Sequence, residues 1–354
     1  MRIGIDCRIA HFTAGGTGVY TRRLTEALAS LPELASDELL LLEAARARQP
    51  LVLGAPKNVH SGRLFTPSHH RWEQALLPLE LLPRGLDVLH SPDYIPPFVR
   101  RCRSVITVHD LAFLRWPDFL TPASQAYFNG HIRHAVESAD AVIAVSQATQ
   151  LDLLELLDAP AEKVHVIYEA PGFAPPAEPL ADAPQDYVLF AGTFEPRKNL
   201  PRLIEAFLEV RRRGYEGKLL LAGAPGWLAE PVLEAVERHA DCVITRRLEP
   251  SLYQGARLLA FPSLYEGFGL PVLEAMACGT PVLTSNVSSL PEIANDAALL
   301  IDPQDVSAIA EGLWRLLTDA DLVADLRRKG LARAAEFSWQ RAAKQTLDVY
   351  HSLA

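Results

Sequence analysis

The chain has 354 residues, which is enough for two domains that each bury a core of their own. Hydrophobic residues make up 49% of the sequence and charged residues 22%, the composition of an ordinary soluble protein. The formal net charge of −9 excludes a general electrostatic attraction to nucleic acid, so we expect no nucleic-acid partner.

The cysteines and the N-terminal residues bear on the cellular compartment. The cysteines lie far apart and form neither a CxxC pair nor a metal-binding pattern with histidine: Cys7, Cys102, Cys242 and Cys278. Reduced core cysteines are the simplest interpretation, which favours the cytoplasm. The chain starts with a strand pattern rather than a signal peptide, and no uninterrupted apolar run is long enough to span a bilayer. We expect a cytoplasmic protein, either free or peripheral at the inner membrane face.

A glycine-rich loop follows the first predicted strand. Apolar residues alternate over Arg2 to Cys7, and helical periodicity runs from Val19 to Ser30. The loop between them contains Gly15, Gly16 and Gly18, whose backbone amides could cradle phosphates. It lacks the third glycine and the acidic ribose partner of a dinucleotide fingerprint, so phosphate binding and simple turn formation are equally good interpretations.

Apolar runs and helical stretches then alternate through the first half of the chain. Four runs have the pattern of strands: Leu39 to Leu42, Asp87 to His90, Ser104 to Val108 and Ala141 to Val145. The alternation predicts an α/β fold with a parallel sheet, in which ligands bind beyond the carboxyl ends of the strands. His109 and Asp110 directly follow one of these strands, so we predict His109 at the ligand site, with Asp110 a weaker candidate.

Two further stretches are candidates for contacts with partners. Arg63 to Leu82 mixes histidine, arginine and tryptophan with proline and leucine, which fits either an acceptor-binding loop or a helix that packs on the core. The basic cluster Arg100, Arg101 and Arg103 fits either a solvated surface or a contact with an anionic membrane or a lipid diphosphate.

A stretch rich in proline and alanine divides the chain. Residues 171–186 have neither a strand nor a helix pattern, so we predict a linker there between domains at 1–170 and 187–337. The second domain opens with a strand over Tyr187 to Ala191, and Arg197 and Lys198 follow it. These two cations could neutralise a diphosphate, although a solvated loop is an equal alternative from the residues alone.

The central motif of the chain is FPSLYEGFGLPVLEAMACGTP, from Phe261 to Pro281. It predicts a short helix over Leu270 to Cys278, with proline at its start and Gly279 just past its end. Two glycines in the preceding turn let a ligand approach the backbone, and the start of the helix favours an anion. Glu274 shares its helix face with small residues, so its carboxylate has room for a ligand.

These residues also resemble a known family. Glu266 and Glu274 are separated by seven residues, and EGFGLPVLEAMACGTPV is similar to the EX7E signature of the family-four retaining glycosyltransferases. GGTGVY, VHDL and EPRKN precede it in the family's order, so the resemblance covers nearly the whole chain. It implies the GT-B fold, with two Rossmann-like parallel-sheet domains facing a central cleft. It also implies that a C-terminal helix, at about 338–354, packs back on the first domain.

The resemblance implies transfer of a hexosyl group from a nucleotide diphosphate sugar to a glycan or polyprenyl-linked acceptor, with retention at the anomeric carbon. It assigns the donor sugar to His109 and Glu266, the diphosphate to Arg197 and Lys198, and the ribose to Glu274. The remaining donor-binding residues are Gly15, Gly16, Gly267, Phe268, Gly269 and Leu270.

The donor is less well defined. Where the family often has a glycine near the nucleotide base, this chain has Thr245-Arg246-Arg247-Leu248, and Leu248 is a weaker candidate for the site. General similarity to bacterial mannosyltransferases of polysaccharide synthesis favours GDP-mannose, with UDP-glucose next. Asp319-Ala320-Asp321 matches the metal-binding DxD motif, but aspartates before a helix are ordinary helix caps. We therefore predict no metal and no other cofactor.

Other functions stay open at this point. A sugar epimerase or a phosphorylase on a similar scaffold differs in its product, since epimerisation needs no acceptor and phosphorolysis consumes phosphate. A non-catalytic nucleotide-sugar-binding protein would bind the donor without turnover. An NAD-dependent oxidoreductase is disfavoured by the incomplete glycine fingerprint.

Overall fold

The computed structural model describes residues 1–353 except 14, 120, 121, 177, 179 and 181, and it leaves the side chains of residues 122–127 undescribed. Parts of the predicted linker and the last residue of the predicted C-terminal helix therefore lie outside the described residues. The chain divides into two compact units. The first comprises residues 1–115, 122–172 and 338–353, and the second comprises 116–119 and the described residues of 173–337.

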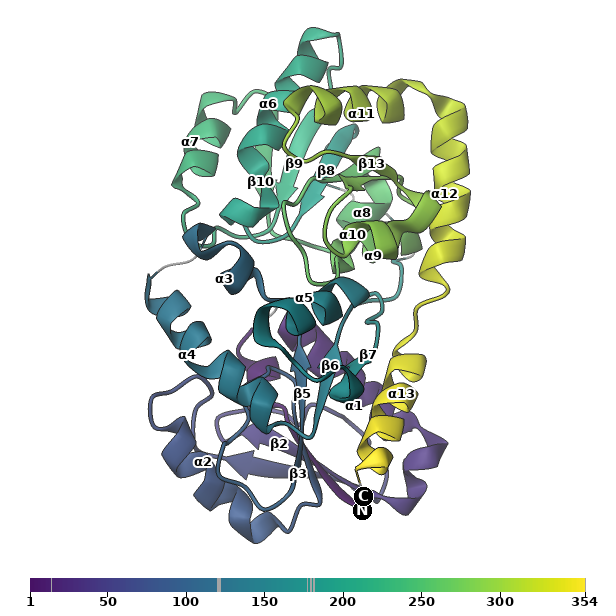
Figure 1. The fold of residues 1–354 in the computed structure, drawn as a ribbon. Coiled ribbons are helices and arrows are strands. Elements are labelled where there is room, and N and C mark those ends of the chain that lie inside the picture. Colours follow the sequence, from purple (N-terminus) through teal and green to yellow (C-terminus); the bar gives the residue numbers. More distant parts are fainter. Residues whose placement is uncertain (14, 120–121, 177, 179, 181, 354) are drawn as a thin grey trace. The chain divides into compact units, whose positions relative to one another are not determined.

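The first unit contains a seven-stranded parallel sheet in the order β3-β2-β1-β4-β5-β6-β7 (Figure 1). Its strands are β1 (Arg2–Asp6), β2 (Glu38–Ala44), β3 (Val59–Leu64), β4 (Val88–Ser91), β5 (Arg103–Val108), β6 (Ala141–Ala144) and β7 (Val164–Val166). Its helices are α1 (Gly16–Ser30), α2 (Glu73–Leu81), α3 (Ala112–Arg115), α4 (Pro122–Ser138), α5 (Gln147–Leu157) and α13 (Trp339–Ser352). The predicted parallel α/β class is confirmed. Its central strands are near-continuous apolar runs because helices cover both faces of such a sheet.

The C-terminal helix α13 is part of the first unit and packs along α1. The ring of Trp339 at its start meets the ring of Tyr20 on α1 edge-on, with centroids 5.8 Å apart. Near its end, the hydroxyl of Tyr350 lies 2.6 Å from Nδ1 of the buried His90 on β4. The chain thus leaves the first unit for the second and returns to it for its last helix.

The strand β3 is absent from the sequence prediction, because only Val59, Gly62 and Leu64 of its six residues are buried. It lies at one edge of the sheet, where its residues His60, Ser61 and Arg63 are exposed to solvent. The helix α2 occupies only the second part of the stretch predicted as an acceptor loop or a packing helix, and residues 65–72 form a loop between β3 and α2. The packing alternative is confirmed for α2, since Leu77 and Leu81 pack into a leucine cluster on the sheet. The loop alternative stays a prediction for residues 65–72.

The second unit contains a six-stranded parallel sheet in the order β10-β9-β8-β11-β12-β13. Its strands are β8 (Tyr187–Ala191), β9 (Lys218–Ala222), β10 (Val243–Arg246), β11 (Leu258–Phe261), β12 (Val282–Ser285) and β13 (Leu299–Ile301). Its helices are α6 (Leu200–Arg212), α7 (Glu230–Arg238), α8 (Ser251–Gly255), α9 (Leu270–Ala277), α10 (Leu290–Ala294), α11 (Val306–Thr318) and α12 (Ala320–Ala334).

Each sheet has one point where the strand order reverses. In the first unit the reversal lies between β1 and β4, and in the second between β8 and β11. The loops that leave the two strands turn away from each other at such a point, which opens a crevice at their carboxyl ends. Both units therefore have a preferred place for a ligand. Among the described residues, no helix is both long enough and apolar enough to cross a bilayer.

Candidate active site

The reversal point of the second sheet brings together two cations and a carboxylate that are far apart in sequence. Arg197 and Lys198 lie in the loop after β8, and Glu266 lies in the loop after β11. Nζ of Lys198 is 2.5 Å from Oε1 of Glu266, and Nη1 of Arg197 is 2.8 Å from Oε2. Each oxygen of the Glu266 carboxylate therefore faces one cation.

A second carboxylate completes this cluster. Oε1 of the buried Glu195 lies 2.6 Å from Nε of Arg197, and Nζ of Lys198 lies 4.8 Å from the centre of the Phe261 ring. The sequence alone predicts no protein partner for the two cations, whereas the structure pairs them with two carboxylates. Glu195 could have been found from the sequence, because it belongs to the same GTFEPRKN loop.

The charge states of this cluster follow from its burial. Burial alone would raise the pKa of Glu266, but the charges of Arg197 and Lys198 outweigh it and lower the pKa to about 2. Burial also lowers the pKa of Lys198, and the neighbouring Arg197 adds to that effect. Glu266 is thus an ionised carboxylate that can only accept hydrogen bonds.

Two serines hold the turn that carries Glu266. The amide of Glu266 donates to Oγ of Ser288 over 2.9 Å, and Oγ of Ser289 donates to the carbonyls of Glu266 and Phe268 over 2.9 and 2.8 Å. Gly269 has a φ of +106°, and a Cβ there would lie 2.9 Å from Cδ2 of Leu290. The turn through Gly267, Phe268 and Gly269 therefore has a fixed backbone that leads into α9.

The helix α9 confirms the short helix predicted in the central motif. It begins at Leu270, and Gly279 after its end has a φ of +69°, a conformation that favours glycine. The expectation that Glu274 has only small neighbours is wrong. The hydroxyl of Tyr253 on α8 donates to Oε2 of Glu274 over 2.7 Å. Burial, together with the charge of Glu274, raises the pKa of Tyr253 well above its ordinary value, so this hydroxyl stays a donor.

In the first unit, His109 follows β5 and has a partner at each ring nitrogen. Nδ1 lies 3.0 Å from Oε1 of Glu169, and Nε2 lies 2.9 Å from the carbonyl oxygen of Pro92. The ring of Tyr20 meets the imidazole edge-on at 4.8 Å. Burial alone would lower the pKa of His109, but the hydrogen bond and charge of Glu169 outweigh it and the pKa is raised. Both partners can accept a hydrogen bond, so this arrangement favours the protonated imidazolium over the neutral ring.

The remaining predicted residues have simpler surroundings. Oδ1 of Asp110 accepts from the amide of Ala112 over 3.0 Å, which fixes the start of α3. Gly15 and Gly16 are exposed at the start of α1, which begins at Gly16 rather than at the predicted Val19. Leu248 lies after β10 and is partly exposed. Thus the second unit groups Arg197, Lys198 and Glu266, whereas the first unit holds His109, Asp110 and the two glycines.

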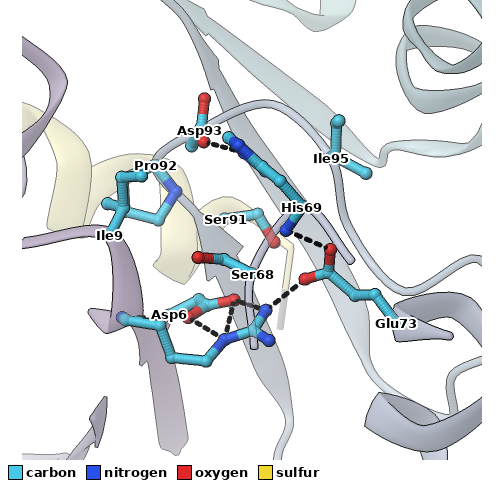
Figure 2. Close-up of a pocket in the computed structure, with 10 residues that line it drawn as sticks. Asp6, Ile9, Ser68, His69, Glu73, Ser91, Pro92, Asp93 and Ile95 are labelled. Atoms are coloured by element: carbon cyan, nitrogen blue, oxygen red, sulfur yellow. Dashed lines mark hydrogen bonds and ion pairs between the residues drawn. The ribbon is translucent and has the colours of Figure 1, made fainter. Parts of the chain in front are cut away.

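The sequence analysis missed a pocket at the reversal point of the first sheet (Figure 2). It is lined by Asp6, Arg8, Ile9, Ser68, His69, Glu73, Ser91, Pro92, Asp93 and Ile95. Asp6 ends β1, and Asp93 follows β4, so the rule that ligands bind at strand ends could have pointed to both.

Buried charges shape this pocket. Nη2 of the buried Arg8 lies 2.5 Å from Oδ2 of Asp6 and 2.5 Å from Oε1 of Glu73. The imidazole of His69 pairs with Asp93, and its backbone amide donates to Oε2 of Glu73 over 2.8 Å. The pocket therefore presents the carboxylates of Asp6 and Glu73, which Arg8 holds in place, and the imidazole of His69, which pairs with Asp93.

No three His, Cys, Asp or Glu side chains among the described residues are arranged to hold a metal ion. Asp319, from the DxD-like sequence, accepts from the amide of Leu322 over 3.0 Å and caps α12. Its interpretation as a helix cap is confirmed.

Comparison with known proteins gives the class of this molecule. The family model "Glycosyltransferase Family 4" matches residues 14–170, and "Glycosyl transferases group 1" matches residues 176–333. Solved structures of similar fold include a sucrose-phosphate synthase from Thermosynechococcus elongatus, with a TM-score of 0.78 at 22% identity over 100% of this chain and 99% of that one. Another is HepE of Anabaena in complex with UDP and glucose, with a TM-score of 0.77 at 18% identity over 99% of this chain and 100% of that one. The protein has the GT-B fold.

Curated relatives are similar over most of the chain. It is 34% identical to the O-antigen chain mannosyltransferase B of Escherichia coli over 86% of this chain and 81% of that protein. It is 33% identical to the serotype-specific mannosyltransferase WbdA of E. coli over 75% of this chain, but this covers only 36% of WbdA. The chain belongs to the family-four glycosyltransferases with the GT-B fold.

Proposed function

We propose that this glycosyltransferase moves a mannosyl group from GDP-mannose to a glycan or polyprenyl-linked acceptor of a surface polysaccharide, with retention and without a metal ion. The observation that carries the proposal is the buried cluster of Arg197, Lys198 and Glu266 at the reversal point of the second sheet. The choice of mannose is supported by the names of the two E. coli relatives, and UDP-glucose is the next candidate donor.

The two cations are suited to stabilise the leaving group. Departure of a nucleoside diphosphate places negative charge on its phosphate oxygens, and fixed cations in a buried site stabilise such charge strongly. Arg197 offers a planar fork of donors, and Lys198 offers a compact charge. We assign the diphosphate to these two residues and to the backbone amides at the start of α9, by Gly269 and Leu270.

The ionised Glu266 is suited to accept hydrogen bonds from sugar hydroxyls. A carboxylate with a pKa of about 2 that faces a cation at each oxygen is a weak base and a weak nucleophile. We therefore assign it no covalent role and favour a front-face reaction, in which the departing phosphate helps to deprotonate the acceptor. Glu274, oriented by the hydroxyl of Tyr253, is assigned to the ribose.

The first unit supplies two further assignments. We assign His109 to the donor sugar, because the resemblance gives it that role and Glu169 fixes the orientation of its ring. We assign the pocket of Figure 2 to hydroxyl groups of the acceptor, because Asp6 and Asp93 line it with oxygens that accept from hydroxyls.

Thermal unfolding with a panel of nucleotides tests the donor assignment. A ligand that binds only the folded state raises the melting temperature, so GDP should raise it in EDTA while NAD should not. A selective shift by UDP would transfer the donor assignment to UDP-glucose. No shift with any diphosphate would contradict the proposed donor site. Product analysis with GDP-mannose then separates transfer from epimerisation, phosphorolysis and binding without turnover.

A further inference from the structure

The helix α2 is apolar on two opposite faces. Leu77 and Leu81 on the inner face pack into the leucine cluster on the sheet. Trp72, just before the helix, lies with Leu76 and Leu79 on the outer side, because positions spaced by four and three residues share a helix face. A helix that is apolar all round is normally buried.

The outer side of α2 is nevertheless exposed to solvent. Five large apolar residues, which we call the outer stripe, have these exposed fractions: Phe65 80%, Leu79 67%, Trp72 54%, Leu82 54% and Leu76 47%. The amide of Phe65 donates to Oε2 of Glu80 on α2 over 2.7 Å, which ties this residue to the helix. An exposed group of large apolar side chains of this kind indicates a surface that another body covers.

The surroundings of the outer stripe are basic, although the whole chain has a net charge of −9. Residues 45–86 contain six arginines and lysines but only two glutamates. Both glutamates are used internally: Glu73 pairs with the buried Arg8, and Glu80 accepts from the amides of Phe65 and Thr66. The uncompensated charge in this part of the chain is therefore positive.

Individual arginines lie beside the stripe. The guanidinium of Arg71 is 5.6 Å from the centre of the Trp72 ring. The side chain of Arg63 donates to the carbonyls of Ala44 and Ala47, which places the loop containing Arg46 and Arg48 next to the end of β3.

We propose that the outer stripe docks on the surface of a bilayer that contains anionic lipids, with α2 lying in the plane of the interface. Leucine, phenylalanine and tryptophan on one helix side, with arginines around them, are the combination that binds such a surface. The apolar side chains enter the headgroup region, and the arginines are attracted to the lipid phosphates. A symmetric contact with a second copy is disfavoured, because it would bring the same basic region of each chain together.

This surface replaces the basic cluster Arg100, Arg101 and Arg103 as the candidate for membrane contact. Nη1 of Arg103 lies 2.8 Å from Oδ1 of Asp140, and Arg100 donates to the carbonyls of Pro97 and Ser138. Two of the three arginines are therefore already engaged within the protein.

Docking through α2 would have a consequence for the acceptor, if the acceptor pocket is as proposed above. His69 and Glu73 line the pocket of Figure 2. Glu73 is the first residue of α2, and His69 lies four residues before it. The docked helix would therefore hold this pocket close to the lipid surface, where a polyprenyl-linked acceptor resides. The docking itself does not depend on glycosyl transfer.

Co-sedimentation of the full chain with lipid vesicles tests the proposal, without donor or acceptor. We expect binding to vesicles of phosphatidylcholine with phosphatidylglycerol, and much weaker binding to phosphatidylcholine alone. The double variant Leu76→Gln/Leu79→Gln should bind the anionic vesicles at least roughly tenfold more weakly, since it removes apolar surface that enters the interface. Leu151→Gln, an exposed leucine on α5 of the same unit, is the matched control and should bind as the parent does.

A second readout locates the contact. Brominated lipids should quench the fluorescence of the parent, and Trp72→Phe should remove most of that quenching. Equal vesicle binding by the parent and the double variant, with both folded by their melting temperatures, would overturn the proposal. The proposal would also be overturned if the parent were a dimer, the double variant were a monomer, and neither bound vesicles. The outer stripe would then be the contact with a second copy. Since the nucleotide panel needs no lipid, failure here is distinguishable from failure of the donor site.

Discussion

Nδ1 of His109 lies 3.0 Å from Oε1 of Glu169, a residue 60 positions later in the chain. With Nε2 facing the carbonyl oxygen of Pro92, both ring nitrogens point at acceptors, and this raises the pKa of His109 against the effect of its burial. Glu169 is thus a positioning residue for His109, and it lies three residues after β7.

Replacing Glu169 with glutamine should make stability depend on pH in a defined direction. The pKa of His109 is raised in the folded state, so the pair stabilises the fold fully below the unfolded pKa of about 6.5 and loses this contribution as pH rises through the folded pKa. We expect Glu169→Gln to lower the free energy of unfolding by about 1.5–3 kcal/mol at pH 5, and by less at pH 9. Denaturant unfolding at the two pH values measures this. Glu155→Gln, on an exposed side chain, is the control, and an equal loss at both pH values would contradict the assignment.

Removing the cations of the second unit should slow the transfer step. Arg197→Met and Lys198→Met should each lower kcat by roughly 10²–10³, as loss of one charge-stabilising donor typically does. Steady-state kinetics with saturating donor measures this. Arg212→Ala, which removes an exposed arginine at the end of α6, should leave kcat unchanged. Normal turnover of both folded variants would show that the cluster is structural only.

The same cluster should stabilise the fold near neutral pH and lose this contribution in acid. Because the pKa of Glu266 is lowered from an ordinary 4.5 to about 2, its contribution is present above 4.5 and is lost as pH falls through 2. We expect Glu266→Gln to be less stable than the parent at pH 6, and the difference to shrink as pH falls from 4.5 to 2. Urea unfolding across this range measures it. A difference that stays constant with pH would mean that Glu266 is not the titrating group.

Tyr253→Phe should weaken nucleotide binding through the ribose and leave the residues assigned to the phosphates unchanged. The variant removes the hydroxyl that donates to Glu274, which leaves a buried carboxylate with one bond fewer and should cost about 1–2 kcal/mol of stability. If Glu274 binds the ribose, the variant should also bind GDP several-fold more weakly by calorimetry. Tyr215→Phe, which removes a hydroxyl bonded to the half-exposed Asp186, is the matched control. Unchanged GDP affinity in Tyr253→Phe would argue against the ribose assignment.

The sequence predicted those features that depend on local pattern. The apolar runs that became β5 and β8 lie where they were predicted, and the position of Arg197 and Lys198 after β8 followed from the strand itself. The edge strand β3 was missed because apolar and polar residues alternate only weakly along it, and three of its six residues are exposed.

Partners that arrive from distant segments could not be predicted. Tyr253 reaches Glu274 from another helix, and neither residue signals the other in the sequence. The pairing of Glu266 with Lys198 depends on β8 and β11 being neighbours, which is a property of strand order rather than of any local motif. The same holds for Arg8, which connects Asp6 to Glu73 across the pocket of the first unit.

The anomeric configuration of the product tests the central claim most directly. The protein would be incubated in EDTA with GDP-mannose, in which the mannose is α-linked, and a mannose-terminated oligosaccharide, and the new linkage would be identified by NMR spectroscopy. If the reaction retains the anomeric configuration, the product is α-mannosidic. If cationic side chains act in place of a metal, the product forms at the same rate with and without EDTA. A β-mannosidic product, or transfer that stops in EDTA and returns with added divalent metal, would contradict it.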